Sequence, residues 1–277
     1  MKWEHENNAK FNVEKFTHIR FNEKEETNEQ FEINGVKIKQ VEYVRDLGII
    51  VNNKGTWDEQ IAEVTKQSRK INGMIFRSFE TREMFAMLTL LKSLILSKID
   101  FGSVLWAPYK VEDLRKIERI QSNFTKRINI PGVDKPDYWT RLEKLNLYSI
   151  ERRFERYQII YMWKILHGLV LNPGIKFINE GSRLGVKCEV PKYTMQLREK
   201  SFHIKGPKLF NKLPKNLTEF PCKDKNDTKL STKMFKKELD TFLKSFPDQP
   251  NLSGEYSRRM EGLDQNCIRT NSLLRIN

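Results

Sequence analysis

The sequence predicts an α+β fold in which helices predominate and a small antiparallel sheet lies near the start. Two observations carry this prediction. Alternating apolar and polar residues, with an Asn-Gly pair between two such runs, are found in residues 11–53. From Thr56 onward, apolar residues recur instead every three or four positions, which places them on one face of a helix. A chain of 277 residues can form one large domain or two to three small ones.

Short strands are expected in residues 11–53. Residues 16–21 alternate loosely, and residues 31–33 and 36–38 alternate well. The Asn34-Gly35 pair between the last two runs is the strongest local signal of a hairpin. A further run, residues 47–51, is expected to form a strand that ends in a loop over residues 52–55.

Two amphipathic helices are expected next. The first should begin with Thr56 as its N-cap, because Glu59 follows at the spacing of a capping box. A second helix is expected after Thr81. Its inward face is predicted to consist of Met84, Leu88, Leu91 and Ile95.

Two further helices complete the middle of the chain. One is predicted over residues 111–128, ended by Pro131-Gly132. The other should run from Ser149, a plausible N-cap, to His167, with Gly168 at its C-cap. This last helix is apolar on all sides, so it is expected to be largely buried.

The periodic signal weakens after residue 171. Residues 172–185 are predicted to be a linker, and short strands are expected near 188–190 and 201–204. A last helix is expected from Ser231, with Met234, Phe235 and Leu239 among its apolar positions. The tail from residue 247 has no clear period.

The net charge of +14 favours a polyanionic partner, such as nucleic acid. Residues 1–55 contain nine Lys or Arg and ten Asp or Glu, so the excess lies entirely from Thr56 onward. Two expected helices carry basic side chains opposite their apolar faces. The candidate nucleic-acid-binding residues are Lys66, Arg69, Lys70 and Arg77 on the first and Arg115, Arg119 and Lys126 on the third. The alternative interpretation is that these are simply solvated helix faces.

Signals for catalysis or cofactor binding are missing from the sequence. It contains no adjacent pair of Asp residues to hold Mg²⁺ ions for phosphoryl transfer, and its three Cys lack zinc-site spacing. We therefore expect no catalytic residue, metal or cofactor in this chain. Trp106, Trp139 and Trp163 could stack on bases, but their apolar neighbours favour core packing.

The sequence also indicates a compartment. The first residues are polar and lack the apolar core of a signal peptide, and Lys or His residues interrupt the longest apolar stretches. No membrane association is expected. An odd number of Cys fits a reducing compartment, so the cytoplasm or nucleus is the expected location.

Several local patterns, taken in order, resemble one protein family. Residues 41–49, which contain Asp46-Leu47-Gly48-Ile49, are similar to a strand pair at the edge of a polymerase palm. Later motifs are Val104-Leu105-Trp106-Ala107-Pro108, Glu118-x-x-Gln121, Tyr138-x-x-Arg141-Leu142, Tyr161-x-x-Lys164-Ile165-Leu166 and Leu209-Phe210-Asn211-x-Leu213-Pro214. Together they resemble reverse transcriptases of retrotransposons without long terminal repeats, of the jockey and chicken-repeat type.

The resemblance implies a division of the chain. Residues 1–55 would be a palm remnant in which Leu47, Gly48 and Ile49 correspond to the primer grip. Residues 56–171 would be a helical thumb, and residues 172–277 a small carboxy-terminal module with a linker, short strands, one helix and an irregular tail. The fingers and most of the palm, with its paired aspartates, would belong to a longer polypeptide. The resemblance implies an origin in an RNA-directed DNA polymerase, which would need Mg²⁺ only in its full-length form, and not that activity in this chain.

Three other interpretations stay open on the sequence. The chain could be a remnant of an element without a selected function, a domesticated binding or scaffold protein, or one piece of a longer enzyme. The main expectation is that this chain holds a template–primer duplex, which could be RNA, DNA or a hybrid. The three interpretations above are alternatives to it.

Overall fold

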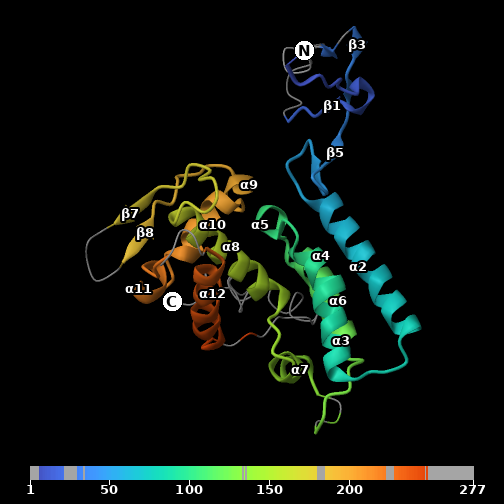
Figure 1. Ribbon diagram of the computed structural model, residues 1–277, viewed down its shortest axis with the longest axis vertical. Coiled ribbons are helices and arrows are strands. Elements are labelled where there is room, and N and C mark those ends of the chain that lie inside the picture. Colours follow the sequence, from blue (N-terminus) through green and yellow to red (C-terminus); the bar gives the residue numbers. More distant parts are fainter. Residues whose placement is uncertain are drawn as a thin grey trace, which may run out of the picture. The chain divides into compact units, whose positions relative to one another are not determined.

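A computed structural model gives the fold of this protein (Figure 1). It describes residues 6–21, 30–33, 35–132, 134, 136–179, 185–222, 228–246 and 248. The fold class is α+β and mostly helical, as predicted. The chain divides into two compact units, Met1–Glu63 and Val64–Asn277, and the division falls within a long helix, α2.

The first unit contains short paired strands. A 3-10 helix, η1 (Val13–Lys15), precedes them. Two pairs are antiparallel and one is parallel. The pairs are β1 (Thr17–His18) with β4 (Lys39–Gln40) in parallel, β2 (Glu32–Ile33) with β3 (Val36–Lys37), and β5 (Tyr43–Asp46) with β6 (Ile49–Asn52).

Two hairpins organise these strands. The hairpin predicted between residues 33 and 36 is confirmed, because Ile33 pairs directly with Val36, although Asn34 lies outside the described residues. The prediction of a single strand over residues 47–51 is wrong at its start. Leu47 and Gly48 form the turn of the β5–β6 hairpin, with φ angles of 45° and 88°. Positive φ at both central residues is the requirement of a type I′ turn, whose twist matches that of the strands.

The second hairpin leads directly into α2 (Asp58–Ser78). The capping box predicted at Thr56 is not formed, because α2 begins two residues later. The side chain of Asn52 takes both partners instead, donating to Thr56 Oγ1 at 2.8 Å and to Glu59 Oε2 at 2.6 Å. Gln60 Oε1 accepts the Ile50 amide at 2.9 Å, so α2 is anchored to β6 by side chains of its first turn.

After α2, the second unit continues with consecutive helical segments. They are α3 (Met84–Leu90), the π-helix η2 (Leu91–Leu96), α4 (Ser97–Asp100), α5 (Ser103–Trp106), α6 (Val111–Thr125), α7 (Tyr138–Lys144) and α8 (Ile150–Leu166). The helix predicted after Thr81 is thus interrupted by a π turn. Met87 is fully buried in addition to Leu91 and Ile95, whereas Met84 and Leu88 are only partly buried.

The helix predicted from Ser149 is confirmed as α8. The Ser149 hydroxyl accepts the Arg152 amide at 3.1 Å, and Gly168 adopts a positive φ of 66° just beyond the end. As expected, α8 is largely buried. It contacts α5, α6 and α10, and Figure 1 shows it running through the middle of this unit.

The remaining elements follow α8 in the sequence, and they share a hydrophobic core with it. They are β7 (Phe177–Asn179), β8 (Val186–Cys188), α9 (Gln196–Glu199), α10 (Phe202–Phe210), α11 (Lys215–Thr218) and α12 (Thr228–Lys244). β7 pairs antiparallel with β8, so the predicted linker contains a strand.

The strand predicted near residues 201–204 is wrong, since these residues begin α10. Gly206 allows this helix to lie close to α8. A Cβ atom at Gly206 would come within 2.9 Å of Met162 Sδ and 2.8 Å of the Phe202 ring. We infer that packing against α8 favours a helix over a strand at the start of α10.

One hydrophobic cluster joins α8 to the elements that follow it. Its members include Trp163 from α8, Phe210 from α10 and Phe235 from α12, all fully buried. Trp163 Nε1 donates to the Phe220 carbonyl at 3.0 Å, which satisfies the polar end of the ring. Residues on both sides of position 171 thus contribute to one core.

Candidate nucleic-acid interface

A groove of about 630 Å³ lies between α2 and the end of α6. Arg69, Asn72 and Gly73 form its α2 side. Asn123, Lys126 and Arg127 form the other side. All six residues belong to the second unit.

An aromatic contact holds the two sides of the groove together. The rings of Phe76 on α2 and Phe124 on α6 lie with centroids 4.9 Å apart. The Arg127 guanidinium lies 4.7 Å from the centroid of Phe76, and the Arg82 guanidinium lies 5.0 Å from it. Cation–π contacts of this kind orient a guanidinium while leaving its N–H groups available. Arg127 is therefore positioned at the groove rather than free to extend into solvent.

Gly73 provides space for a further cation. A Cβ atom at this position would lie 3.2 Å from Nη1 of Arg77, so the Arg77 side chain folds back along α2 toward the groove lining. This direction is the one that helical side chains prefer, toward the N-terminus of their own helix. The absence of a side chain at Gly73 thus brings the Arg77 guanidinium beside the groove.

The electrostatic character of the groove is strongly positive. Arg69, Lys126 and Arg127 line it, and Arg77 lies beside it, while none of its described lining residues is acidic. Within the described part of the chain, neither Arg69 nor Lys126 takes part in an ion pair, and both are exposed. Two Asn amides add neutral hydrogen-bonding groups.

The structure brings some of the predicted residues together and separates others. Arg69 and Lys126 face each other across the groove, with Arg77 next to it. Lys66 and Lys70 are exposed on α2 but do not line the groove. On α6, Arg119 is exposed and Arg115 is partly buried, and neither lines it.

Four groove residues, Asn72, Gly73, Asn123 and Arg127, were not among the sequence candidates. The helical projection of residues 111–128 places Arg127 beside the basic face and not on it, whereas α6 ends at Thr125 and Arg127 lies in the turn that follows. Asn72 and Asn123 carry no charge, and the charge pattern gives no signal for them.

The three residues predicted as primer-grip-like lie at the β5–β6 turn. Leu47, at the tip of the turn, is 87% exposed, and Gly48 completes the turn. Ile49 is buried at the start of β6. The turn therefore presents one apolar side chain to solvent.

Trp106, Trp163 and His167 pack within the described part of the chain. Trp106 and Trp163 are fully buried, as expected for core residues, and Trp139 is partly buried. The His167 ring lies against Phe220, with Nε2 3.0 Å from its carbonyl oxygen, and burial lowers the pKa of this imidazole. Nε2 of the exposed His203 lies 3.0 Å from the Pro173 carbonyl oxygen.

The carboxyl group of Glu118 has a strongly perturbed acidity, and it lies in the core. Its oxygens accept the Tyr138 hydroxyl at 2.5 Å and the Ile150 amide at 2.8 Å. Burial raises its pKa to about 8, despite these two donors. Gln121 donates to the same Tyr138 oxygen at 3.0 Å and to the Tyr148 carbonyl at 2.9 Å. These bonds connect α6, α7 and the start of α8, so the function of Glu118 is structural.

No family model, curated protein or solved structure matches this chain. The site is therefore interpreted from its own residues. Among the described residues, no group of three or more His, Cys, Asp or Glu side chains is arranged to hold a metal ion. None of the described helices is long and apolar enough to cross a bilayer.

Proposed function

We propose that this protein binds the sugar–phosphate backbone of a nucleic acid in the groove between α2 and α6. The observation that carries the proposal is the convergence of Arg69, Lys126 and Arg127 on one groove whose described lining contains no carboxylate. Residues from two different helices meet there, which distinguishes this arrangement from a solvated basic face on one helix.

The chemistry of the groove suits phosphates. Arginine presents several N–H donors that match phosphate oxygens, and lysine supplies a compact charge. Each phosphate that is neutralised releases condensed counterions, so binding should weaken steeply with salt. Contacts of this kind position a strand or duplex without reading its sequence.

The resemblance to retrotransposon reverse transcriptases supports the same proposal. Both sides of the groove come from residues 56–171, the stretch that corresponds to a thumb in that family, where a template–primer duplex is held. In this interpretation, the exposed Leu47 turn would contact the primer end. The chain would descend from an RNA-directed DNA polymerase, would act in the cytoplasm or nucleus, and would not polymerise on its own, since its sequence contains no paired aspartates.

Fluorescence anisotropy with a labelled RNA–DNA hybrid tests the proposal. The double variant Arg69→Gln/Lys126→Gln should bind roughly tenfold more weakly at moderate salt and should reduce the salt slope by about 2. Lys98→Gln/Lys144→Gln is the matched control, because it removes the same charge from exposed positions that do not line the groove.

Two outcomes would contradict the proposal. One is the absence of binding by the parent chain at low salt. The other is an equal loss of affinity in the groove variant and its control, which would indicate attraction to net charge alone. A primer-extension assay accompanies the measurement, and extension by the purified chain would overturn the expectation that it does not polymerise.

A further inference from the structure

A second pocket, of about 420 Å³, lies between the end of α8 and the first half of α12. Lys164 contributes to it from α8, and Lys229, Lys233 and Lys236 contribute from α12. Its volume is within the range of ordinary ligand sites. It belongs entirely to the second unit and shares no lining residue with the α2–α6 groove.

The three α12 lysines lie on one face of that helix. Their spacing of four and three residues makes them neighbours along the helix surface, where like charges repel one another. Phe235 and Leu239, on the adjoining face of α12, are fully buried in the core, so this packing keeps the lysine face directed toward Lys164 of α8. The packing therefore holds three positive charges together, with Lys164 as a fourth.

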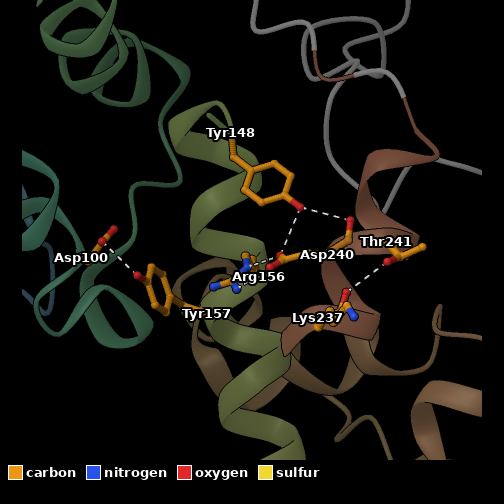
Figure 2. A network of polar contacts seen from close by, with 7 residues as sticks. All are labelled: Asp100, Tyr148, Arg156, Tyr157, Lys237, Asp240 and Thr241. Carbon is orange, nitrogen blue, oxygen red and sulfur yellow. Dashed lines mark hydrogen bonds and ion pairs between the residues drawn. The ribbon is translucent and has the colours of Figure 1, made fainter. Parts of the chain in front are cut away.

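Asp240 of α12, four residues beyond Lys236, is already held in an ion pair. Arg156 donates to both carboxylate oxygens of Asp240, from Nε at 2.5 Å and from Nη2 at 2.9 Å, and Tyr148 donates its hydroxyl to Oδ1 at 3.1 Å (Figure 2). Asp240 does not line the pocket, and none of the described residues that do is acidic. The lysines therefore lack a carboxylate partner within the pocket lining that the structure describes.

The acidity of Lys236 reflects this environment. Partial burial lowers its pKa, and the positive charges of Arg156 and Lys164 lower it further, whereas Asp240 acts in the opposite direction. An anion in the pocket would offset the repulsion of Lys236 by Arg156 and Lys164.

We propose that the pocket between α8 and α12 is a second anion site, which takes closely spaced phosphate groups. Lysine ammonium groups bind phosphates as point charges and tolerate several geometries. The hydroxyl of Thr232 already donates to the Thr228 carbonyl at 2.7 Å, so the lysines provide the contacts. Two sources offer this chemistry, a nucleic-acid strand or a free polyphosphate compound. The site does not depend on the function proposed for the α2–α6 groove.

Isothermal titration of the full chain with inorganic tripolyphosphate at low salt tests the site. Lys233→Gln/Lys236→Gln should weaken binding roughly tenfold, which corresponds to the loss of about 1.4 kcal/mol. The control Lys237→Gln/Lys244→Gln removes the same charge from exposed positions on the same helix outside the pocket, and should change affinity less than about twofold. Thermal unfolding shows whether each variant is folded. If the variant that contains Lys236→Gln does not fold, Lys229→Gln/Lys233→Gln takes its place.

Two further measurements complete the design. Competition with a labelled single-stranded oligonucleotide identifies the source. If the pocket variant loses oligonucleotide affinity as well, the phosphates belong to a strand, and if only tripolyphosphate binding is lost, they belong to a free compound. Tripolyphosphate binding should persist in Arg69→Gln/Lys126→Gln. The proposal is overturned if tripolyphosphate does not bind, if the pocket and control variants lose affinity equally, or if only the groove variant loses it.

Discussion

Trp163 of α8 lies flat against Phe235 of α12, with ring centroids 4.7 Å apart and planes inclined by 10°. Both side chains are fully buried. This contact fixes α12 on α8, and it thereby sets the positions of the pocket lysines on the adjoining face of α12.

Phe235→Ala should destabilise the protein by about 3–5 kcal/mol, because it removes a large buried ring and leaves a cavity against Trp163. Met234→Ala is the control, since the neighbouring Met234 is 39% exposed and should cost less than about 1 kcal/mol. Chemical denaturation monitored by tryptophan fluorescence measures both. Equal effects of the two substitutions would contradict the packing described for α12.

Asp240→Asn should destabilise the protein by about 1–3 kcal/mol. The substitution leaves the Arg156 guanidinium, whose side chain is 16% exposed, without its carboxylate partner. Glu238→Gln removes a carboxylate from an exposed position on the same helix and should change the free energy of unfolding by less than about 0.5 kcal/mol. Thermal unfolding of both variants tests whether this ion pair holds α12 to α8.

Glu118 should make stability depend on pH. Its pKa is raised from an ordinary value of 4.5 to about 8 in the fold, so its stabilising contribution is fully present below about pH 4.5. This contribution is lost as the pH rises toward 8, at roughly 1.4 kcal/mol for each pH unit over which the unfolded carboxyl is ionised and the folded one is not. Nearby Tyr138 and Asp248, whose pKa values are also raised, belong to the same polar cluster.

The measurement is the free energy of unfolding as a function of pH for the parent chain and for Glu118→Gln. Because the glutamine of Glu118→Gln does not ionise, the free energy of unfolding of this variant should change less between pH 5 and 8. The parent chain should therefore lose stability relative to the variant as the pH rises. Glu112→Gln, at an exposed position of the same helix, should run parallel to the parent. Three parallel curves would show that Glu118 titrates normally in the fold.

Leu47→Asn should stabilise the β5–β6 hairpin by roughly 0.5–1 kcal/mol. Leu47 has a φ of 45° and is 87% exposed, so the side chain pays a steric cost without burying surface, and Asn tolerates this conformation better. Gly48→Ala should destabilise the same hairpin, because its φ is 88°. Amide hydrogen exchange in β5 and β6 reports both changes. A stabilised Leu47→Asn that binds the hybrid more weakly would indicate that the leucine is retained for contact with nucleic acid.

Some elements could be predicted from the sequence because their ends carry local signals. α8 is delimited by Ser149 and Gly168, which act within one turn of chain. The strand predicted near residues 201–204 failed for the opposite reason. A short apolar run is compatible with either a strand or a buried helix, and the close approach of Gly206 to Met162 decides between them. That contact is between residues distant in sequence, so no local pattern contains it.

The candidate site was partly predictable on the same grounds. The helical period predicts Arg69, which lies within α2, and Lys126, which directly follows the last residue of α6. Their position across from each other depends on the contact between Phe76 and Phe124, which the period does not specify. The lysine pocket combines Lys164 with residues of α12 that come much later in the chain, and for that reason it was not predicted at all.

The hydrophobic cluster that joins α8 to α10 and α12 makes α8 dependent on the residues that follow it in the chain. A polypeptide that stopped near Leu171 would leave Trp163 and its neighbours in contact with water, and such a product would tend to aggregate. Loss of the residues after 171 would therefore also destabilise α8, although α8 lies before that point in the chain.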